Sequence, residues 1–232
     1  MQYMGSKNKI AKYILPVMLA KRKLNQWWVE PFVGGANIID KVEGKRIGND
    51  NHVYLVALLK ALQRGWIPPT DISKDLYYSV KNFPEDYTDE LVGFIGFLCS
   101  FGSKWWGGYA FNSKGQNYAE SGSRALVKQA SRFEGIIFQC NNYLDMKIPE
   151  NSIIYCDPPY TNTTKYHSAF NHTEFWWWCR GKVKEGHTVF VSEYTAPDDF
   201  RCIKEIVHKT ILDKNSQYPR VEKLFKMLDD ES

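Results

Sequence analysis

The sequence lacks the features that mark membrane, secreted and zinc-binding proteins. Its longest apolar stretches, residues 91–99 and 175–179, are far shorter than the roughly 20 residues that a transmembrane helix needs. Residues 1–12 contain no apolar core of the signal-peptide kind. The five cysteines are scattered and show no CxxC spacing, which favours reduced thiols over zinc ligands. We therefore expect a soluble, cytoplasmic protein with no metal and no membrane partner.

The chain also lacks a strong net charge. Its length is sufficient for a full hydrophobic core. The chain has 232 residues, of which 44% are hydrophobic, and a formal net charge of +4. A chain of this size can bury one hydrophobic core and carry an insertion. Because a charge of +4 favours a nucleic-acid partner only weakly, local clusters of charge have to decide that question.

An apolar run ends abruptly at residues 157–160, which read Asp-Pro-Pro-Tyr. The preceding residues 153–156 suit a strand buried on both faces, and two prolines cannot continue a ladder. Asp157 is therefore predicted at the carboxyl end of a strand, where open α/β sheets bind ligands. There Asp157 would offer an acceptor and Tyr160 a flat stacking surface. The alternative is a Pro-Pro turn that only closes a core strand.

A second pattern, at residues 27–39, predicts a strand, a glycine turn and a helix. Gly34 and Gly35 would let the backbone approach a ligand, and the N–H groups of the helix start would face an anion. The spacing is not a full GxGxxG fingerprint, so a plain turn is the alternative.

A Gly-Ser-Lys turn at residues 5–7 precedes another predicted helix, over residues 8–22, and suits either an anion or a simple helix cap.

Residues 46–50 predict a second strand, which ends at Asp50 and leads into an amphipathic helix over residues 52–63. Asp50 lies about twenty residues past the first turn, the offset at which nucleotide-binding folds place a carboxylate on ribose hydroxyls. The alternative is that Asp50 or Asn51 only caps the helix.

Positive charge gathers in the middle of the chain. This region contains several prolines, then an apolar helical run at residues 91–101, then an aromatic, glycine-rich loop at residues 102–115. Between residues 100 and 133 only Glu120 opposes five cations. The cations are Lys104, Lys114, Arg124, Lys128 and Arg132. Such a patch suits DNA phosphates, whereas a solvated helix face with a Trp-rich packing loop is the alternative.

The remaining chain predicts further strands. Residues 136–143 and 186–194 read as strands, a helix begins near residue 175, and residues 203–211 and 221–227 read as a closing antiparallel pair. Polar loops are expected at residues 161–168 and 213–220, and a frayed acidic tail at residues 229–231.

Together these motifs resemble the Dam-type adenine-specific DNA methyltransferases, a family of S-adenosylmethionine-dependent amino-methyltransferases. The resemblance covers most of the chain in order. It implies a doubly wound, mostly parallel α/β fold of the class I, Rossmann-like methyltransferase kind. Residues 1–64 would form the cofactor-binding half, residues 65–134 an inserted target-recognition region, and residues 135–232 the catalytic half. It also implies methylation of adenine N6 in double-stranded DNA after base flipping, in a bacterial or phage-infected cell.

The resemblance assigns roles to individual residues. Asp157 and the Pro158 carbonyl would accept hydrogen bonds from the target amine, and Tyr160 would stack on the base, with Pro159 completing the catalytic motif. The residues implied to bind the cofactor are Tyr3, Gly5, Lys7, Pro31, Phe32, Gly34, Gly35, Asp50, Asn51, Asn142, Tyr143 and Asp157. Those implied to bind DNA are Lys104, Asn112, Lys114, Arg124 and Lys128.

Some positions depart from the family pattern, and other functions remain open. Tyr3 stands where the best-known members have Trp, Glu30 replaces the commoner Asp, and Asn142 stands where many relatives carry Asp, although an amide oxygen can still accept. The rival functions are methylation of cytosine N4, of RNA or of a protein amide, and binding of DNA and cofactor without turnover. A dinucleotide-dependent oxidoreductase is disfavoured because the glycine fingerprint is incomplete.

Overall fold

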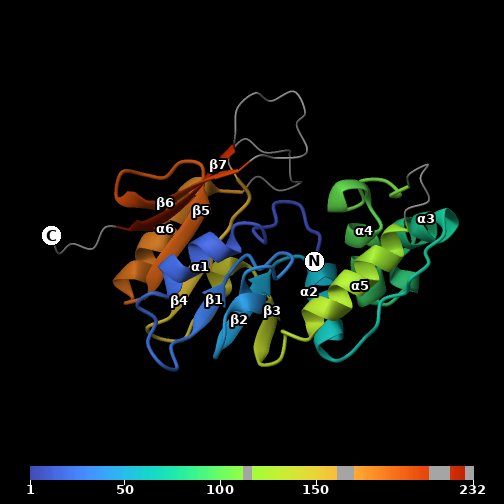
Figure 1. Ribbon diagram of the computed structural model, residues 1–232, viewed down its shortest axis with the longest axis horizontal. Coiled ribbons are helices and arrows are strands. Elements are labelled where there is room, and N and C mark those ends of the chain that lie inside the picture. Colours follow the sequence, from blue (N-terminus) through green and yellow to red (C-terminus); the bar gives the residue numbers. More distant parts are fainter. Residues whose placement is uncertain (112–116, 161–169, 209–219, 228–232) are drawn as a thin grey trace.

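The computed structural model describes residues 1–111, 117–160, 170–208 and 220–227. They form a seven-stranded sheet with helices on both faces and a group of further helices beyond one edge (Figure 1). The strand order is β3-β2-β1-β4-β5-β7-β6. The strands are β1 (Trp28–Glu30), β2 (Arg46–Asp50), β3 (Ile136–Cys140), β4 (Ile153–Cys156), β5 (Thr188–Glu193), β6 (Phe200–His208) and β7 (Arg220–Met227).

The sheet is mostly parallel and doubly wound, as the sequence predicted. Strands β1 to β5 run parallel, whereas β7 pairs antiparallel with both β5 and β6. Because β1 lies between β2 and β4, the chain winds outward from β1 on one side and from β4 on the other. The carboxyl ends of β1 and β4 therefore meet at the switch point, where open α/β sheets bind ligands.

Alternating residues of the strands face two separate cores. Trp28, Tyr155 and Leu224 contribute to a core with α1 (Ala11–Leu19) and α2 (Val53–Gln63). Their neighbours in the strands point to the other face, where they pack against α6 (His172–Lys184). A strand with cores on both faces has no polar side, which explains the continuous apolar runs that mark β1 and β4 in the sequence.

The predicted insert, residues 65–134, contains three α-helices among its described residues. They are α3 (Lys74–Asn82), α4 (Asp89–Leu98) and α5 (Tyr118–Ala130). Helix α4 packs closely on α2, since a Cβ on Gly93 would stand 2.2 Å from the Tyr54 carbonyl oxygen. A second attachment comes from Arg132, just after α5, whose guanidinium binds the buried carboxylate of Asp40 at 2.6 Å. The insert is thus anchored to the core of the sheet region.

Two predictions about helices differ from the structure. The helix predicted over residues 8–22 is shorter at both ends, and it contains Pro16. The helix predicted directly after Gly35 is wrong, because a turn and a 3₁₀ helix, Ile39–Lys41, stand in its place. Gly34 and Ala36 both have positive φ, so the chain turns twice before a helix can start, and Gly44, with φ +77°, ends the segment soon after.

Other boundaries follow the prediction closely. The helix over residues 52–63 begins at Val53 with the His52 imidazole as its N-cap, accepting from Leu55 N–H. Within the described ranges, no helix has the length and apolar character to cross a bilayer. The polar loops predicted at residues 161–168 and 213–219, and the acidic tail at residues 229–231, lie outside the described residues.

Candidate active site at the carboxyl edge of the sheet

Lys7 connects two carboxylates at the end of β4. Asp157 directly follows β4, and its Oδ1 lies 3.2 Å from Lys7 Nζ. Glu222, on β7, places its Oε2 3.4 Å from the same nitrogen. Lys7 is only 7% exposed and Glu222 8%, while the Asp157 side chain is 21% exposed, so most of this ion-pair cluster is shielded from water. The cluster joins the N-terminal loop, the Asp-Pro-Pro-Tyr loop and the antiparallel end of the sheet.

The cluster changes the protonation behaviour of Asp157. Burial raises its pKa to about 6; the positive charge of Lys7 opposes this rise and the negative charge of Glu222 adds to it. Burial alone would lower the pKa of Lys7, but the two carboxylates outweigh burial and raise it. Lys7 is therefore a permanent cation at neutral pH, and Asp157 is ionised above about pH 6.

One oxygen of Asp157 is left with acceptor capacity. Its Oδ1 is buried, and although Lys7 lies 3.2 Å away, no described residue donates a well-oriented hydrogen bond to it. A carboxylate oxygen has more than one lone pair, so Oδ1 can accept a further hydrogen bond beside its ion pair with Lys7. This oxygen is suited to accept a hydrogen bond from a bound amine.

The Tyr160 ring is held on several sides. Its hydroxyl donates to Glu222 Oε2 at 2.7 Å, and Lys7 Nζ lies 4.3 Å from the ring centroid. Tyr194, after β5, meets the ring at a centroid distance of 4.7 Å and an interplanar angle of 82°. Burial, together with Asp157 and Glu222, raises the pKa of Tyr160 well above its ordinary value. The phenol therefore stays protonated and keeps donating.

The glycine turn after β1 is packed against the N-terminal loop. A Cβ on Gly34 would stand 2.9 Å from Tyr3 Cε1, and one on Gly35 would stand 2.8 Å from Tyr3 Cβ. The Tyr3 ring also contacts Phe97 of the insert at 5.4 Å. Only glycine fits this close approach at either position, and Gly34 additionally has φ +47°.

Asp50 lies at the end of β2, beside the glycine turn, as the sequence predicted. Its two oxygens accept from the N–H groups of Gly34 and His52, each at 3.1 Å. Burial raises the pKa of Asp50 against the effect of these backbone donors. Asn51 follows as an exposed residue. Each carboxylate oxygen retains further acceptor capacity, so Asp50 can hold the loop and still meet a ligand hydroxyl.

An aromatic cluster stands beside the end of β3. Phe32 contacts Tyr143 at 5.1 Å and Phe170 at 5.7 Å. Tyr143 also meets Phe175 and Trp178 of α6. Phe32, Tyr143 and Phe170 are only partly buried, so the cluster presents apolar surface at the carboxyl edge.

Asn142, next to this cluster, is already used in the local fold. Its amide oxygen accepts from Leu144 N–H at 3.1 Å and caps the 3₁₀ helix Tyr143–Asp145. The side chain is exposed. The alternative of a plain strand end therefore has a structural basis at this position, whereas Tyr143 lies in the aromatic cluster.

Three of the predicted DNA-binding residues lie among the described residues of the insert. Lys104 lies in the loop after α4, and Arg124 and Lys128 lie on α5, where Arg124 pairs with Glu120 at 2.5 Å. Arg132, counted in the basic cluster, forms an ion pair with Asp40. Asn112 and Lys114 are outside the described residues.

The tryptophans of the insert have a packing role, which was the alternative interpretation of this loop. Trp105 stacks on Tyr54 at 5.7 Å and contacts His52 at 4.3 Å. Trp106 meets Tyr77 at 5.3 Å.

Two site residues were missed by reasoning from the sequence. Asn49 is fully buried and ties three strand ends together, donating to the carbonyls of Pro31 and Asn141 and accepting from Asn141 N–H. Glu222 is the other. Its signal was present, because Glu222 and Leu224 share the inward face of β7, and an acid at a core-facing position needs a buried partner.

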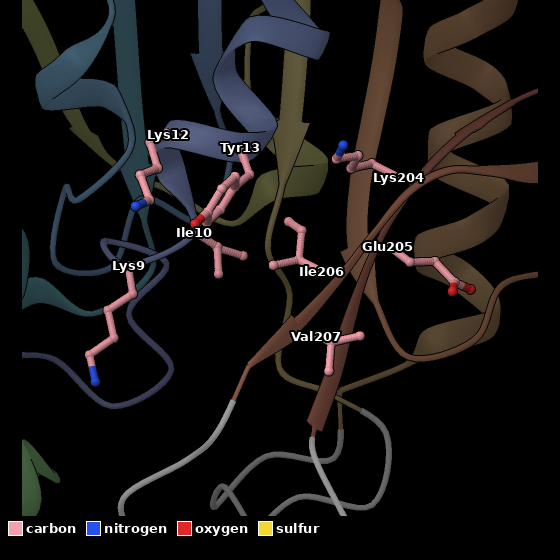
Figure 2. A pocket seen from close by; sticks show the side chains of 8 residues that line it. All are labelled: Lys9, Ile10, Lys12, Tyr13, Lys204, Glu205, Ile206 and Val207. Carbon is pink, nitrogen blue, oxygen red and sulfur yellow. The ribbon is translucent and has the colours of Figure 1, made fainter.

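A shallow groove lies beside the ion-pair cluster. Figure 2 shows its side chains, which come from the start of the chain and from β6. They are Lys9, Ile10, Lys12, Tyr13, Lys204, Glu205, Ile206 and Val207. Ile206 pairs with Glu222 in the sheet, so the groove is one strand away from the cluster. Among the described residues, no group of His, Cys, Asp or Glu side chains is arranged to hold a metal ion.

A family model matches the N-terminal part of the chain. Residues 3–96 match the D12 class N6 adenine-specific DNA methyltransferases. The matched segment contains Tyr3, Lys7, the glycine turn and Asp50, and it ends before the Asp-Pro-Pro-Tyr loop. The resemblance expected from the sequence is thus confirmed over these residues. No curated protein matches the chain.

Two solved structures resemble the fold. One is lmo1582 from Listeria monocytogenes, assigned as a class I S-adenosylmethionine-dependent methyltransferase, with 14% identity and a TM-score of 0.40 over 100% of this chain. The other is SMU.472, assigned as a methyltransferase and complexed with SAH, with 10% identity and a TM-score of 0.39 over 97% of this chain. This chain spans 62% and 53% of their respective lengths. With TM-scores below 0.5, neither likeness establishes a function for this chain.

Proposed function

We propose that this protein, whose residues 3–96 carry the pattern of the D12 class N6 adenine-specific DNA methyltransferases, transfers a methyl group from S-adenosylmethionine to adenine N6 in double-stranded DNA. The observation that carries the proposal is the pairing of Asp157 with Lys7 beside the Tyr160 ring. This arrangement lies at the switch point of the sheet and leaves a buried acceptor oxygen for an amine.

The residues at the carboxyl edge fit S-adenosylmethionine. Gly34 and Gly35 let the turn pack directly against Tyr3, which brings together two segments proposed to bind the methionine part of the cofactor. Asp50 offers oxygens for ribose hydroxyls, and Phe32 and Tyr143 offer an apolar surface for a purine. When bound, the cofactor supplies an electrophilic methyl group on a sulfonium. Lys7 and Gly5, the other residues proposed to bind the cofactor in the N-terminal loop, lie 3.4 Å apart between Nζ and the carbonyl oxygen.

Asp157 prepares the target nitrogen. The lone pair of an adenine amine is delocalised into the ring, and an acceptor pair that binds both N–H groups favours a pyramidal, nucleophilic nitrogen. Asp157 Oδ1 and the Pro158 carbonyl form that pair in our proposal, and Pro159 fixes the loop. The nitrogen–carbon bond forms as the sulfur–carbon bond breaks, and the amine then loses one proton. Asp157, with a pKa of about 6, can hold this proton before solvent takes it.

Tyr160 provides the stacking surface for the extruded base. The amine of a paired adenine is inaccessible inside the duplex, so the base has to be flipped out. Since Glu222 and Lys7 already hold the ring, stacking requires little further ordering of Tyr160. Lys104, Arg124 and Lys128 are proposed to contact DNA phosphates, and the same role for Asn112 and Lys114 rests on the sequence alone.

The decisive experiment is transfer of a tritiated methyl group to duplex DNA, followed by nucleoside analysis. We expect N6-methyladenine with the wild type and a loss of at least about 100-fold in Asp157→Ala, since the variant lacks the acceptor. Glu205→Gln, an exposed acid on β6, is the matched control and should retain activity. Methylated cytosine, absent transfer to any DNA, or full activity of Asp157→Ala would contradict the proposal. Calorimetry that shows cofactor binding without transfer would favour a binding protein instead.

A further inference from the structure

Glu222 is an acid in a place where a charge is costly. It lies on β7, between β5 and β6 in the sheet, and is 8% exposed. It is paired in the ladder with Ile206, and its strand neighbour Leu224 is fully buried. A buried carboxylate needs charge partners and donors to offset its desolvation. Glu222 finds both in residues that belong to the candidate active site.

The same oxygen of Glu222 contacts two of these residues. Its Oε2 accepts from the Tyr160 hydroxyl at 2.7 Å and lies 3.4 Å from Lys7 Nζ. Lys7 in turn lies 3.2 Å from Asp157 Oδ1 and 4.3 Å from the Tyr160 ring centroid. One cation thus stands between two acids and beneath one ring. Glu222 is the member of this set that belongs to the sheet, whereas the other three lie on loops.

We propose that Glu222 is a positioning residue of the methyl-transfer site, which orients the Tyr160 ring through its hydroxyl and holds Lys7 against Asp157. This inference rests on the proposed function for its consequence in catalysis. Strand residues are better anchors than loop residues because a ladder fixes their backbone. With the ring and the ammonium group held from β7, the Asp-Pro-Pro-Tyr loop keeps its geometry before DNA arrives.

Glu222 has two effects of opposite sign on catalysis. Its hydrogen bond to Tyr160 orders the stacking surface and so favours transfer. Its negative charge works to raise the pKa of Asp157 and so disfavours the ionised form that accepts from the amine. The titration of Asp157 therefore reports the charge of Glu222, whereas methyl transfer reports its hydrogen bond to Tyr160.

Several other groups face Asp157 and are not themselves substituted in a variant at position 222. They are Lys7 from the N-terminal loop, Tyr160 from the same loop as Asp157, Tyr155 and Cys156 from β4, and Glu30 from β1.

The first test measures the Asp157 carboxyl titration by carbon-13 NMR in the protein without cofactor or DNA. Glu222→Gln keeps an oxygen that can accept from Tyr160 but removes the charge, so the pKa of Asp157 is expected to fall below its wild-type value of about 6. Glu205→Gln, which removes an exposed acid from the neighbouring strand, is the matched control and should leave it unchanged. An unchanged or raised Asp157 pKa in Glu222→Gln would overturn the inference.

The second test is a double-mutant cycle on methyl transfer with Glu222→Ala, Tyr160→Phe and the double variant. Each single change is expected to lower kcat about 10-fold, the equivalent of one charge-assisted hydrogen bond, with the KM for DNA less affected. Because Glu222→Ala already removes the bond that Tyr160→Phe removes, the double variant should be hardly worse than Glu222→Ala alone. Multiplicative effects would contradict the inference.

Two further comparisons distinguish a failure of this inference from misfolding of a variant and from a failure of the proposed function. If Glu222→Ala does not fold, Glu222→Asp, which keeps the charge but shortens the reach, replaces it in the cycle and is expected to lie between wild type and Tyr160→Phe. If wild type transfers no methyl group, the proposed function fails, and the NMR titration still decides whether Glu222 acts on Asp157.

Discussion

The backbone N–H of Gly34 donates to Asp50 Oδ2 at 3.1 Å, which joins the glycine turn after β1 to the end of β2. The other oxygen of Asp50 accepts from His52 N–H, the N-cap of α2. One carboxylate therefore fixes a turn and a helix start on two neighbouring strands.

Replacement of Asp50 is expected to loosen this turn. Asp50→Ala leaves two backbone donors unsatisfied, which should cost ~1–3 kcal/mol of unfolding free energy and weaken binding of S-adenosylmethionine at least about 10-fold. Asp50→Asn keeps one acceptor oxygen, so its stability and its cofactor affinity should lie between those of wild type and Asp50→Ala. Urea denaturation and calorimetry measure the two effects. Asp75→Ala, an exposed acid in the first turn of α3, serves as control. Unchanged cofactor affinity in Asp50→Ala would exclude the predicted role.

The pH dependence of methyl transfer should report Asp157. Because the acid has to be ionised to accept from the amine and its pKa is about 6, kcat is expected to fall as the pH drops through about 6. Single-turnover rates between pH 5 and pH 8 measure this acidic limb of the pH–rate profile. An acid limb near pH 4, the ordinary range of a carboxylate, would show that burial does not act on the catalytic acid.

Asp157 should also make the fold less stable at high pH. Its pKa rises from 3.8 to about 6 on folding, so the folded state binds the proton more tightly, and the stability this provides at low pH is lost as the pH rises through about 6. The shift corresponds to ~3 kcal/mol at pH 8. Asp157→Asn is therefore expected to be inactive but more stable than wild type at pH 8, with the difference shrinking towards pH 4.

We expect Asp199 to change stability with pH in the opposite direction, because its hydrogen bond to Arg180 lowers its pKa. Asp199→Asn should lose stability at pH 8, where the ionised form is fully present, and approach wild type below the ordinary pKa of an aspartate. Thermal denaturation of both variants across the same pH series provides the comparison. Destabilisation of Asp157→Asn at pH 8 would contradict the account of Asp157.

The attachment of the insert depends on Arg132. Its removal leaves the buried Asp40 carboxylate with Lys41 as its remaining ion-pair partner among the described residues, and we expect Arg132→Ala to cost ~1–3 kcal/mol of unfolding free energy. Arg124→Ala breaks an exposed pair on the same region and should cost at most ~0.5 kcal/mol. Equal effects of the two changes in denaturant titrations would refute the anchoring role.

Alanine substitutions at two glycines, one in α4 and one in α6, test the close packing of α4 on α2. A Cβ at position 93 would meet the Tyr54 carbonyl oxygen at 2.2 Å, so Gly93→Ala should destabilise the protein by ~1–3 kcal/mol. Gly181, within α6, has open space where a Cβ would lie, and Gly181→Ala should stabilise by up to ~1 kcal/mol through helix propensity. The melting temperatures of the two variants should therefore move in opposite directions.

The sequence alone determined the elements whose physics is local. The run at residues 153–156 could only end at Asp157, because two prolines stop a strand, and the structure places Asp157 there. Asp50 was also predicted at the end of its strand, and the closing antiparallel pair predicted at residues 203–211 and 221–227 lies at Phe200–His208 and Arg220–Met227. Polar residues at strand ends meet at one edge whenever the strands are parallel.

Only the tertiary structure decided which side chains share that edge. Lys7, Asp157 and Glu222 are brought within hydrogen-bond or ion-pair range by the position of β7 in the sheet, and no local pattern gives that position. In the same way, the turn after Gly35 replaced a predicted helix, and Arg132 paired with Asp40, a partner that no local pattern indicated. Long-range electrostatics and packing depend on which segments meet, whereas propensity depends only on neighbours in the chain.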